Sequence, residues 1–216
     1  GINRLSIGIQ SFDDEILKSL NRSHNAMQAK NSIEIAINSR IKNISVDIMF
    51  NLPNQGLTKL DESLNICFGY DINHLSIYGL TIEPYTVLHK RILQNEINKP
   101  SDAIFIKQYN HITDLSEKKG FLNYEISNFS KKNYESNHNK NYWFGSEYLG
   151  VGPSAHSFNG LSRRWNVKNN FLYMKYLKSD KKYYECETLS KKDIYNEYIM
   201  RRIRTNKGID IKDIKQ

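Results

Sequence analysis

The sequence predicts an α/β protein in which parallel strands alternate with helices, and three observations support this fold class. Runs of β-branched residues recur through residues 1–90 of the 216-residue chain, each followed by a loop and an amphipathic stretch. Hydrophobic residues make up 39% of the chain, which suffices for a core and excludes a wholly disordered protein. No apolar run approaches the roughly 20 residues that a membrane-spanning helix needs, so we expect no integral membrane protein.

Three strands are expected in the first part of the chain, adjacent, parallel and in sequential order. They cover residues 5–10, 44–50 and 75–80. Ser11 and Asp14 are expected to form a capping box before a short helix, and a longer helix is expected over residues 26–39. Thr58 and Asp61 are expected to cap the next helix, which carries Cys67 on its apolar side.

The second half of the chain is predicted to form an α+β region. The expected elements are a helix over 101–119 ending at Gly120, a strand over 121–126, a polar loop over 128–141, an aromatic and glycine-rich turn or strand region over 142–158, and helices over 170–177 and 191–204, the last ended by Gly208.

The three strands alternate between apolar and polar residues. Parallel strands covered on both faces are usually apolar throughout, so an alternating pattern indicates that one face packs on helices and the other does not. Asp47 illustrates this, because a carboxylate inside a strand is costly without a partner. An open sheet with one wet face is the alternative, but a ligand-filled lumen fits the pattern better.

Charge and cysteine content narrow the function classes. The net charge is 31 − 23 = +8, but the lysine pairs are scattered and lack the base-reading residues of nucleic-acid modules, so no nucleic-acid partner is predicted. Cys67 and Cys186 lie too far apart for a metal knuckle and are too few for a secreted disulfide framework, which favours the cytoplasm. The chain begins at Gly1 in a strand-like segment, and we expect a fragment cut inside a domain.

Several motifs carry a resemblance to a known family. RLSIGIQSF (residues 4–12), LNR (20–22) and VDIMFNLP (46–53) resemble the second half of the radical S-adenosylmethionine (SAM) barrel of the oxygen-independent coproporphyrinogen III oxidase group. YEISNF (124–129), HNKNYW (138–143) and YLGVGPSAHS (148–157) are similar to the HemW haem chaperone branch of that group. The resemblance implies the C-terminal part of a (β/α)6 barrel over residues 1–100, followed by a C-terminal region over 101–216 that is incomplete at its end.

The resemblance implies that Gln10, Arg22 and Asp47 contact SAM. The residue chemistry agrees, because an aspartate accepts hydrogen bonds from hydroxyl and amino groups and an arginine pairs with a carboxylate in a fork. Gln10 and Asp47 also lie at or near the carboxyl ends of strands, where parallel α/β folds bind ligands. From the residues alone, Arg22 fits equally well as a surface arginine at a helix end.

The family holds a [4Fe–4S] cluster on a C-x3-C-x2-C loop, and nothing in this sequence matches that loop. A site-differentiated cluster needs three thiolates in one place, so no ligand of the [4Fe–4S] cluster is predicted in this chain. Cluster chemistry is expected only of the full-length protein.

The HNKNYW motif implies haem binding, with His138 as an axial ligand, Tyr142 as a second and Trp143 as a flat wall. Lys131 and its neighbour Lys132 are expected to neutralise haem propionates. The alternative is that His138 caps a turn and Trp143 is core.

Two functions follow from the resemblance. The first is a haem chaperone that delivers haem to accepting proteins on a radical SAM scaffold. The second is the oxidative decarboxylation of coproporphyrinogen III, for which no catalytic residue can be named. An unrelated α/β binder of sugars or nucleotides is a third, weaker alternative.

Overall fold

The computed structural model describes residues 1–214, and the chain divides into two compact units, Gly1–Glu135 and Ser136–Gln216. The first unit therefore extends past residue 100, because helix α5 (Asp102–Lys118) and the strands β4 (Leu122–Glu125) and β5 (Asn128–Ser130) pack on the same sheet as the preceding elements. The family boundary near residue 100 stays a prediction.

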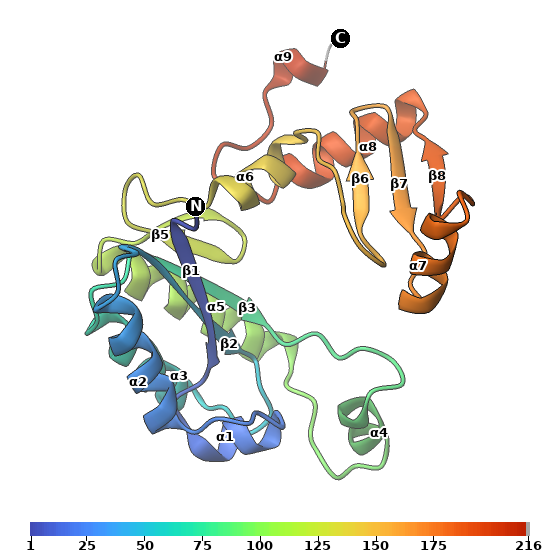
Figure 1. Cartoon of the computed structure of the whole chain (residues 1–216). Helices are drawn as coiled ribbons and strands as arrows, with labels where there is room; N and C mark the ends of the chain where they lie inside the picture. Colours follow the sequence, from blue (N-terminus) through green and yellow to red (C-terminus); the bar gives the residue numbers. More distant parts are fainter. Residues whose placement is uncertain (215–216) are drawn as a thin grey trace. The chain divides into compact units, whose positions relative to one another are not determined.

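The first unit is built on a five-stranded sheet in the order β1-β2-β3-β5-β4 (Figure 1). Its other elements are β1 (Arg4–Gln10), α1 (Asp14–Ser19), α2 (Ala26–Ile37), β2 (Asn43–Phe50), α3 (Leu57–Phe68), β3 (His74–Gly79) and α4 (Val87–Leu93). Strands β1, β2 and β3 are adjacent, parallel and sequential, which confirms the prediction. Strands β5 and β4 continue the sheet in antiparallel pairing, and β5 lies in a segment that we expected to be a loop.

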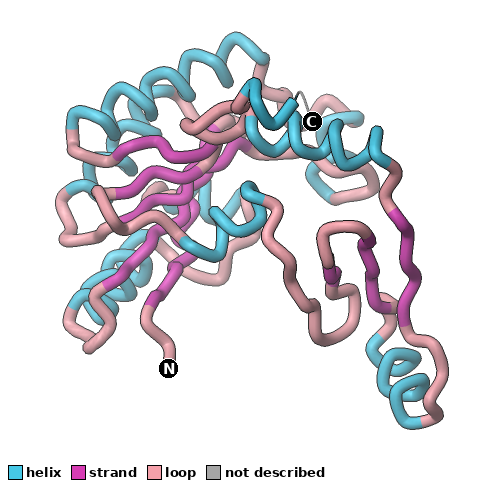
Figure 2. The backbone as a smooth tube through the Cα atoms, turned by 90° about the horizontal axis from the view of Figure 1, so that it is seen from above, coloured by secondary structure: helices cyan, strands magenta, loops and turns pink. Residues whose placement is uncertain are grey.

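The second unit has a sheet of its own, with the antiparallel order β6-β7-β8 (Figure 2, magenta). Its elements are α6 (Asn137–Phe144), β6 (His156–Phe158), β7 (Ser162–Asn166), α7 (Asn170–Lys178), β8 (Tyr184–Thr188), α8 (Lys191–Arg202) and α9 (Ile211–Ile214). Within residues 1–214, no helix has the length and apolar character needed to span a bilayer.

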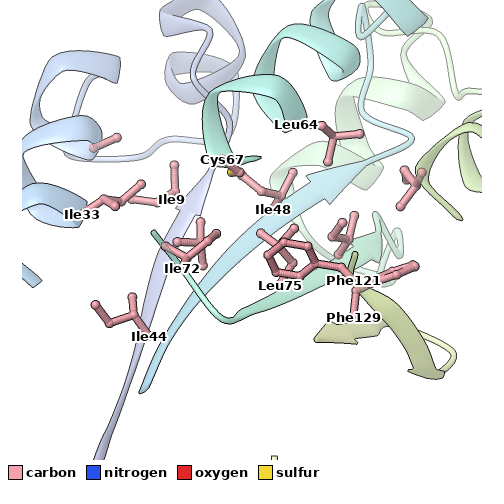
Figure 3. Packing of buried hydrophobic residues seen from close by; sticks show 14 of the residues in the cluster. Ile9, Ile33, Ile44, Ile48, Leu64, Cys67, Ile72, Leu75, Phe121 and Phe129 are labelled. Carbon is pink, nitrogen blue, oxygen red and sulfur yellow. The ribbon is translucent and has the colours of Figure 1, made fainter. Parts of the chain in front are cut away.

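The core of the first unit lies between one face of the sheet and helices α2, α3 and α5 (Figure 3). Val46 and Leu75 point from the strands into this core, and Ile33, Leu64 and Cys67 meet them from the helices, each fully buried. Cys67 is thus a core residue, as expected. The polar residues of β1, β2 and β3 occupy the opposite face, which confirms the two-faced pattern.

Two helix caps differ from the sequence-based expectations. Helix α1 is capped by Asp13, whose side chain accepts from the Ile16 N–H at 2.9 Å, so the capping box predicted at Ser11 is wrong. Helix α3 begins after Gly56 without a side-chain cap, because glycine has no side chain that could accept from the first N–H groups, so the cap predicted at Thr58 is also wrong. The capping box lies instead at α2, between Asn25 and Gln28.

Two corrections concern the second unit. Residues 137–144 are helical rather than a loop and turn, because the Ser136 hydroxyl caps the Asn139 N–H and Gly145 ends the helix in the left-handed conformation at φ 72°. Helix α8 ends at Arg202, so Gly208 lies beyond it and does not end it.

Candidate functional site

The polar face of the parallel strands brings Gln10, Arg22 and Asp47 together around Gly8. Asp47 lies opposite Gly8 in the β1–β2 pairing and accepts a hydrogen bond from the Ser6 hydroxyl at 2.9 Å. Arg22 Nη2 donates to the Gly8 carbonyl at 3.1 Å. A Cβ on Gly8 would lie 2.9 Å from Gln10 Nε2 and 3.7 Å from Arg22 Nη2. The absence of a side chain at Gly8 therefore lets the amide and the guanidinium converge.

Gln10 is held in an unusual conformation at the end of β1. The pairing with β2 shifts between Gly8 and Gln10, and Gln10 has a φ of 69°. The Tyr78 hydroxyl donates to Gln10 Oε1 at 2.9 Å, which turns Nε2 away from that contact and leaves its N–H groups for a ligand. Burial, together with nearby Asp47, raises the pKa of Tyr78, so the phenol stays protonated and keeps donating. Strand alternation placed Tyr78 on this face, but no local pattern indicated that its hydroxyl would contact Gln10.

A second polar network closes the amino-terminal end of the same face. His74 is 1% exposed and lies between the Ser45 hydroxyl, 2.7 Å from Nδ1, and the Tyr124 hydroxyl, 2.8 Å from Nε2. Burial and the nearby Arg4 lower the pKa of His74 to about 3, so the imidazole is neutral at physiological pH. This network leaves no local signal in the sequence, because the partners of His74 come from two other strands.

The two ends of the polar face thus differ chemically. The amino-terminal end is buried and satisfied internally, whereas Asp47, Arg22 and Gln10 are only partly satisfied by the protein. A carboxylate, a guanidinium and an amide around one point can bind a ligand that carries hydroxyl or amino groups together with a carboxylate. The Gly8 gap and the free Gln10 amide fit such a zwitterionic ligand.

The HNKNYW segment forms a second candidate site on α6. His138 and Tyr142 are one helical turn apart, with ring centroids 5.0 Å from each other, and Tyr148 packs on Tyr142 at 4.9 Å. These three residues, with Glu147, line a hollow of about 70 Å³. His138 is exposed and lies inside the helix rather than at its cap, so the turn-capping alternative is wrong.

Trp143 lines a neighbouring hollow of about 190 Å³, which shares Tyr142 and Tyr148 with the first one. Trp143 is half-buried, so it is neither a core residue nor free of packing. The expected propionate partner Lys131 lies in the first unit, 3.3 Å from Asp71 and over the Phe121 ring. The structure thus brings His138 and Tyr142 together and places Trp143 beside them.

The cysteines do not form a metal site. Cys67 is buried in the first unit and Cys186 is exposed in the second, and the described side chains, those of residues 1–212, include no group of three or more His, Cys, Asp or Glu that could bind a metal ion. Burial raises the pKa of the Cys67 thiol, which disfavours the thiolate form. A [4Fe–4S] cluster does not fit the two thiols of this chain.

Comparison with known proteins agrees with the fold and the motifs. A family model described as the radical SAM superfamily matches residues 1–67. The heme chaperone HemW of Bacillus subtilis is 38% identical over 77% of this chain and 44% of its own length. The chain belongs to the HemW type of radical SAM sequences. The heme chaperone HemW of Buchnera aphidicola from Acyrthosiphon pisum is 36% identical over 100% of this chain and 56% of its own length.

A solved structure adds evidence for the fold of this HemW-type chain. The structure described as coproporphyrinogen III oxidase (HemN) from Escherichia coli, a radical SAM enzyme, has a TM-score of 0.78 and covers 100% of this chain and 52% of its own. Its sequence identity is 18%, so the likeness concerns the fold. The chain spans about half the length of the curated relatives it matches. The roles of individual residues stay predictions.

Proposed function

We propose that this protein is a haem-binding chaperone on a radical SAM scaffold, which passes haem to an accepting protein. The observation that carries the proposal is the pairing of His138 and Tyr142 on one exposed face of α6. An imidazole and a phenol are both protein ligands of haem iron. The names of the HemW relatives support this proposal.

The exposure of the α6 face suits transfer rather than permanent storage. Tyr142 is 45% exposed, and neither hollow beside it encloses a ligand completely. In this proposal the His138 imidazole would provide a nitrogen donor for the haem iron, the Tyr142 phenol would provide an oxygen as a second donor, and Trp143 would supply a flat apolar contact for the ring. Bound haem would supply the iron atom that such a donor ligates. An accepting protein can reach the same face, because His138 and Tyr142 are both exposed.

We further propose that Gln10, Arg22 and Asp47 bind SAM. Asp47 would accept from hydroxyl groups of the ligand, Arg22 would pair with its carboxylate, and Gln10 would donate through Nε2. The Gly8 gap and the Tyr78–Gln10 hydrogen bond support this arrangement. Because the two cysteines do not fit a [4Fe–4S] cluster, the proposal assigns cluster ligands to no residue of this chain. We also propose a cytoplasmic location, since both cysteines are free thiols.

The rival function is the decarboxylation of coproporphyrinogen III, and the HemN likeness supports it only at the level of fold. Coproporphyrinogen III contains no iron, so an oxidase has no use for an axial imidazole on α6. The two functions therefore differ in what they require of His138.

Haem titration followed by visible absorption tests the proposal. We expect the protein to give a Soret band typical of ligated haem, and His138→Ala to shift that band or weaken binding. Tyr142→Phe shifts the band only if the phenol oxygen coordinates. His156→Ala is a matched control, because His156 is an exposed histidine of the same unit that lines neither hollow beside α6.

Two outcomes contradict the proposal. The first is identical haem spectra and affinities for the His138→Ala variant and the unsubstituted protein. The second is anaerobic conversion of coproporphyrinogen III by the protein loaded with its cluster, combined with unchanged haem spectra for His138→Ala, which would favour the oxidase.

A further inference from the structure

The hollow beside Trp143 joins an aromatic wall to two arginines. The wall consists of Tyr142, Trp143, Tyr148 and Phe158, and the arginines are Arg163 of β7 and Arg201 of α8. Its volume of about 190 Å³ is below the ~300–1,000 Å³ of pockets that enclose whole drug-sized ligands. The hollow therefore fits one edge of a larger flat molecule.

The two arginines differ in what they can still bind. Arg163 is already neutralised, because its Nη2 lies 2.9 Å from both carboxylate oxygens of Glu197 and its Nη1 lies 3.7 Å from Glu187. Arg201 donates only through Nε, to the backbone carbonyl of Glu197 at 3.2 Å. Among the side chains that the structure describes, residues 1–212, its two terminal nitrogens make no hydrogen bond or ion pair, and they lie beside Gly145, which lines the hollow together with Arg201. Arg201 thus offers an unused fork of donors.

Gly145 explains why the Arg201 guanidinium can lie there. Gly145 ends α6 with a φ of 72°, and a Cβ at this position would lie 2.8 Å from Arg201 Cζ. Any other residue would be strained and would displace the guanidinium. Arg202 and Lys207 both lie over the Phe144 ring, with charged groups 5.1 and 5.0 Å from its centroid. The end of α6 is therefore strongly positive.

We propose that Arg201 binds a carboxylate arm of the tetrapyrrole whose iron faces His138. This inference rests on the proposed haem function and adds the group that orients the ligand. Tyr142 and Tyr148 line both hollows, so a flat ligand against them has one side at His138 and one edge at Arg201. The planar guanidinium pairs with a carboxylate through two parallel hydrogen bonds, which fixes the rotation of the ring about its iron.

The test compares haem with its iron protoporphyrin dimethyl ester, in which both carboxylates are blocked. We expect Arg201→Gln to weaken haem binding about five- to tenfold, because a half-exposed charged hydrogen bond is partly screened by solvent. The same substitution should leave the Kd for the ester within twofold, on the order of measurement error. Arg201→Lys keeps the charge and should retain most of the affinity for haem.

Lys192→Gln is the matched control, since it removes an exposed positive charge from the opposite end of α8. Circular dichroism establishes that each variant is folded. Unchanged haem affinity in Arg201→Gln overturns the inference, and so does an equal loss for haem and ester, which would indicate a packing role. If the unsubstituted protein binds neither porphyrin, the proposed function itself fails; haem binding without an Arg201 effect removes only the inference.

Discussion

The buried imidazole of His74 predicts how the stability of the first unit depends on pH. Its pKa is lowered from 6.5 to about 3 in the folded protein, whereas an unfolded chain titrates it near 6.5. Above pH 6.5 both states are neutral and the full stability is present. As the pH falls from 6.5 towards 3, only the unfolded state gains a proton, so stability is lost at about 1.4 kcal/mol per pH unit. At pH 5 the loss due to His74 is therefore about 2 kcal/mol.

The assay is urea unfolding at pH 7.5 and pH 5.0, for the unsubstituted protein and His74→Gln. Far-UV circular dichroism is the signal, because Trp143 and Trp165 lie in the second unit and their fluorescence does not report the first. The unsubstituted protein should lose about 2 kcal/mol more than His74→Gln between the two pH values. His89→Gln, on α4, should follow the unsubstituted protein.

Parallel pH profiles for the unsubstituted protein and His74→Gln would refute this reasoning. They would mean that His74 takes up its proton inside the folded protein, so that the Ser45–His74–Tyr124 contacts do not require a neutral imidazole.

Two further predictions concern the core and the polar face of the first unit. Leu64→Ala should lower the free energy of unfolding by about 2–5 kcal/mol, because Leu64 is 0% exposed and its loss leaves a cavity between α3 and the sheet. Denaturant titration measures this free energy, and a change below about 1 kcal/mol would contradict the packing. Asp47→Ala should weaken SAM binding about tenfold to a hundredfold in calorimetry with the cluster-loaded full-length protein, and unchanged affinity would remove Asp47 from the site.

Strands β1, β2 and β3 could be predicted because their signal is local. Apolar and polar residues alternate along each strand, as at Val46 and Asp47. A few positions of sequence therefore predict both the strand and its two faces. Strand β5 could not be predicted, since it has three residues and depends on its pairing with β3, which lies more than fifty positions earlier. Short strands take their stability from such distant partners rather than from their own composition.

Helix α6 shows a different limit. Its sequence is rich in asparagine and aromatic residues, which have modest helix propensity, so composition favoured a loop. The helix is defined at its ends instead, by the Ser136 cap and by Gly145. The motif resemblance pointed to His138, Tyr142 and Trp143 as haem-site candidates, but only the helical geometry brings the first two to one face. No sequence pattern indicated a role for Arg201, because the position of its guanidinium depends on Gly145 in a distant segment.

The burial of Cys67 makes the rate of its reaction with a thiol reagent a measure of local opening. Cys186 is exposed on β8, so a thiol reagent can modify it in the closed molecule, whereas Cys67 is 0% exposed and burial raises its pKa. Modification of Cys67 therefore requires α3 to separate from the sheet. The ratio of the two rates at one reagent concentration gives the fraction of time that this helix is detached, with Cys186 as the internal standard in every molecule.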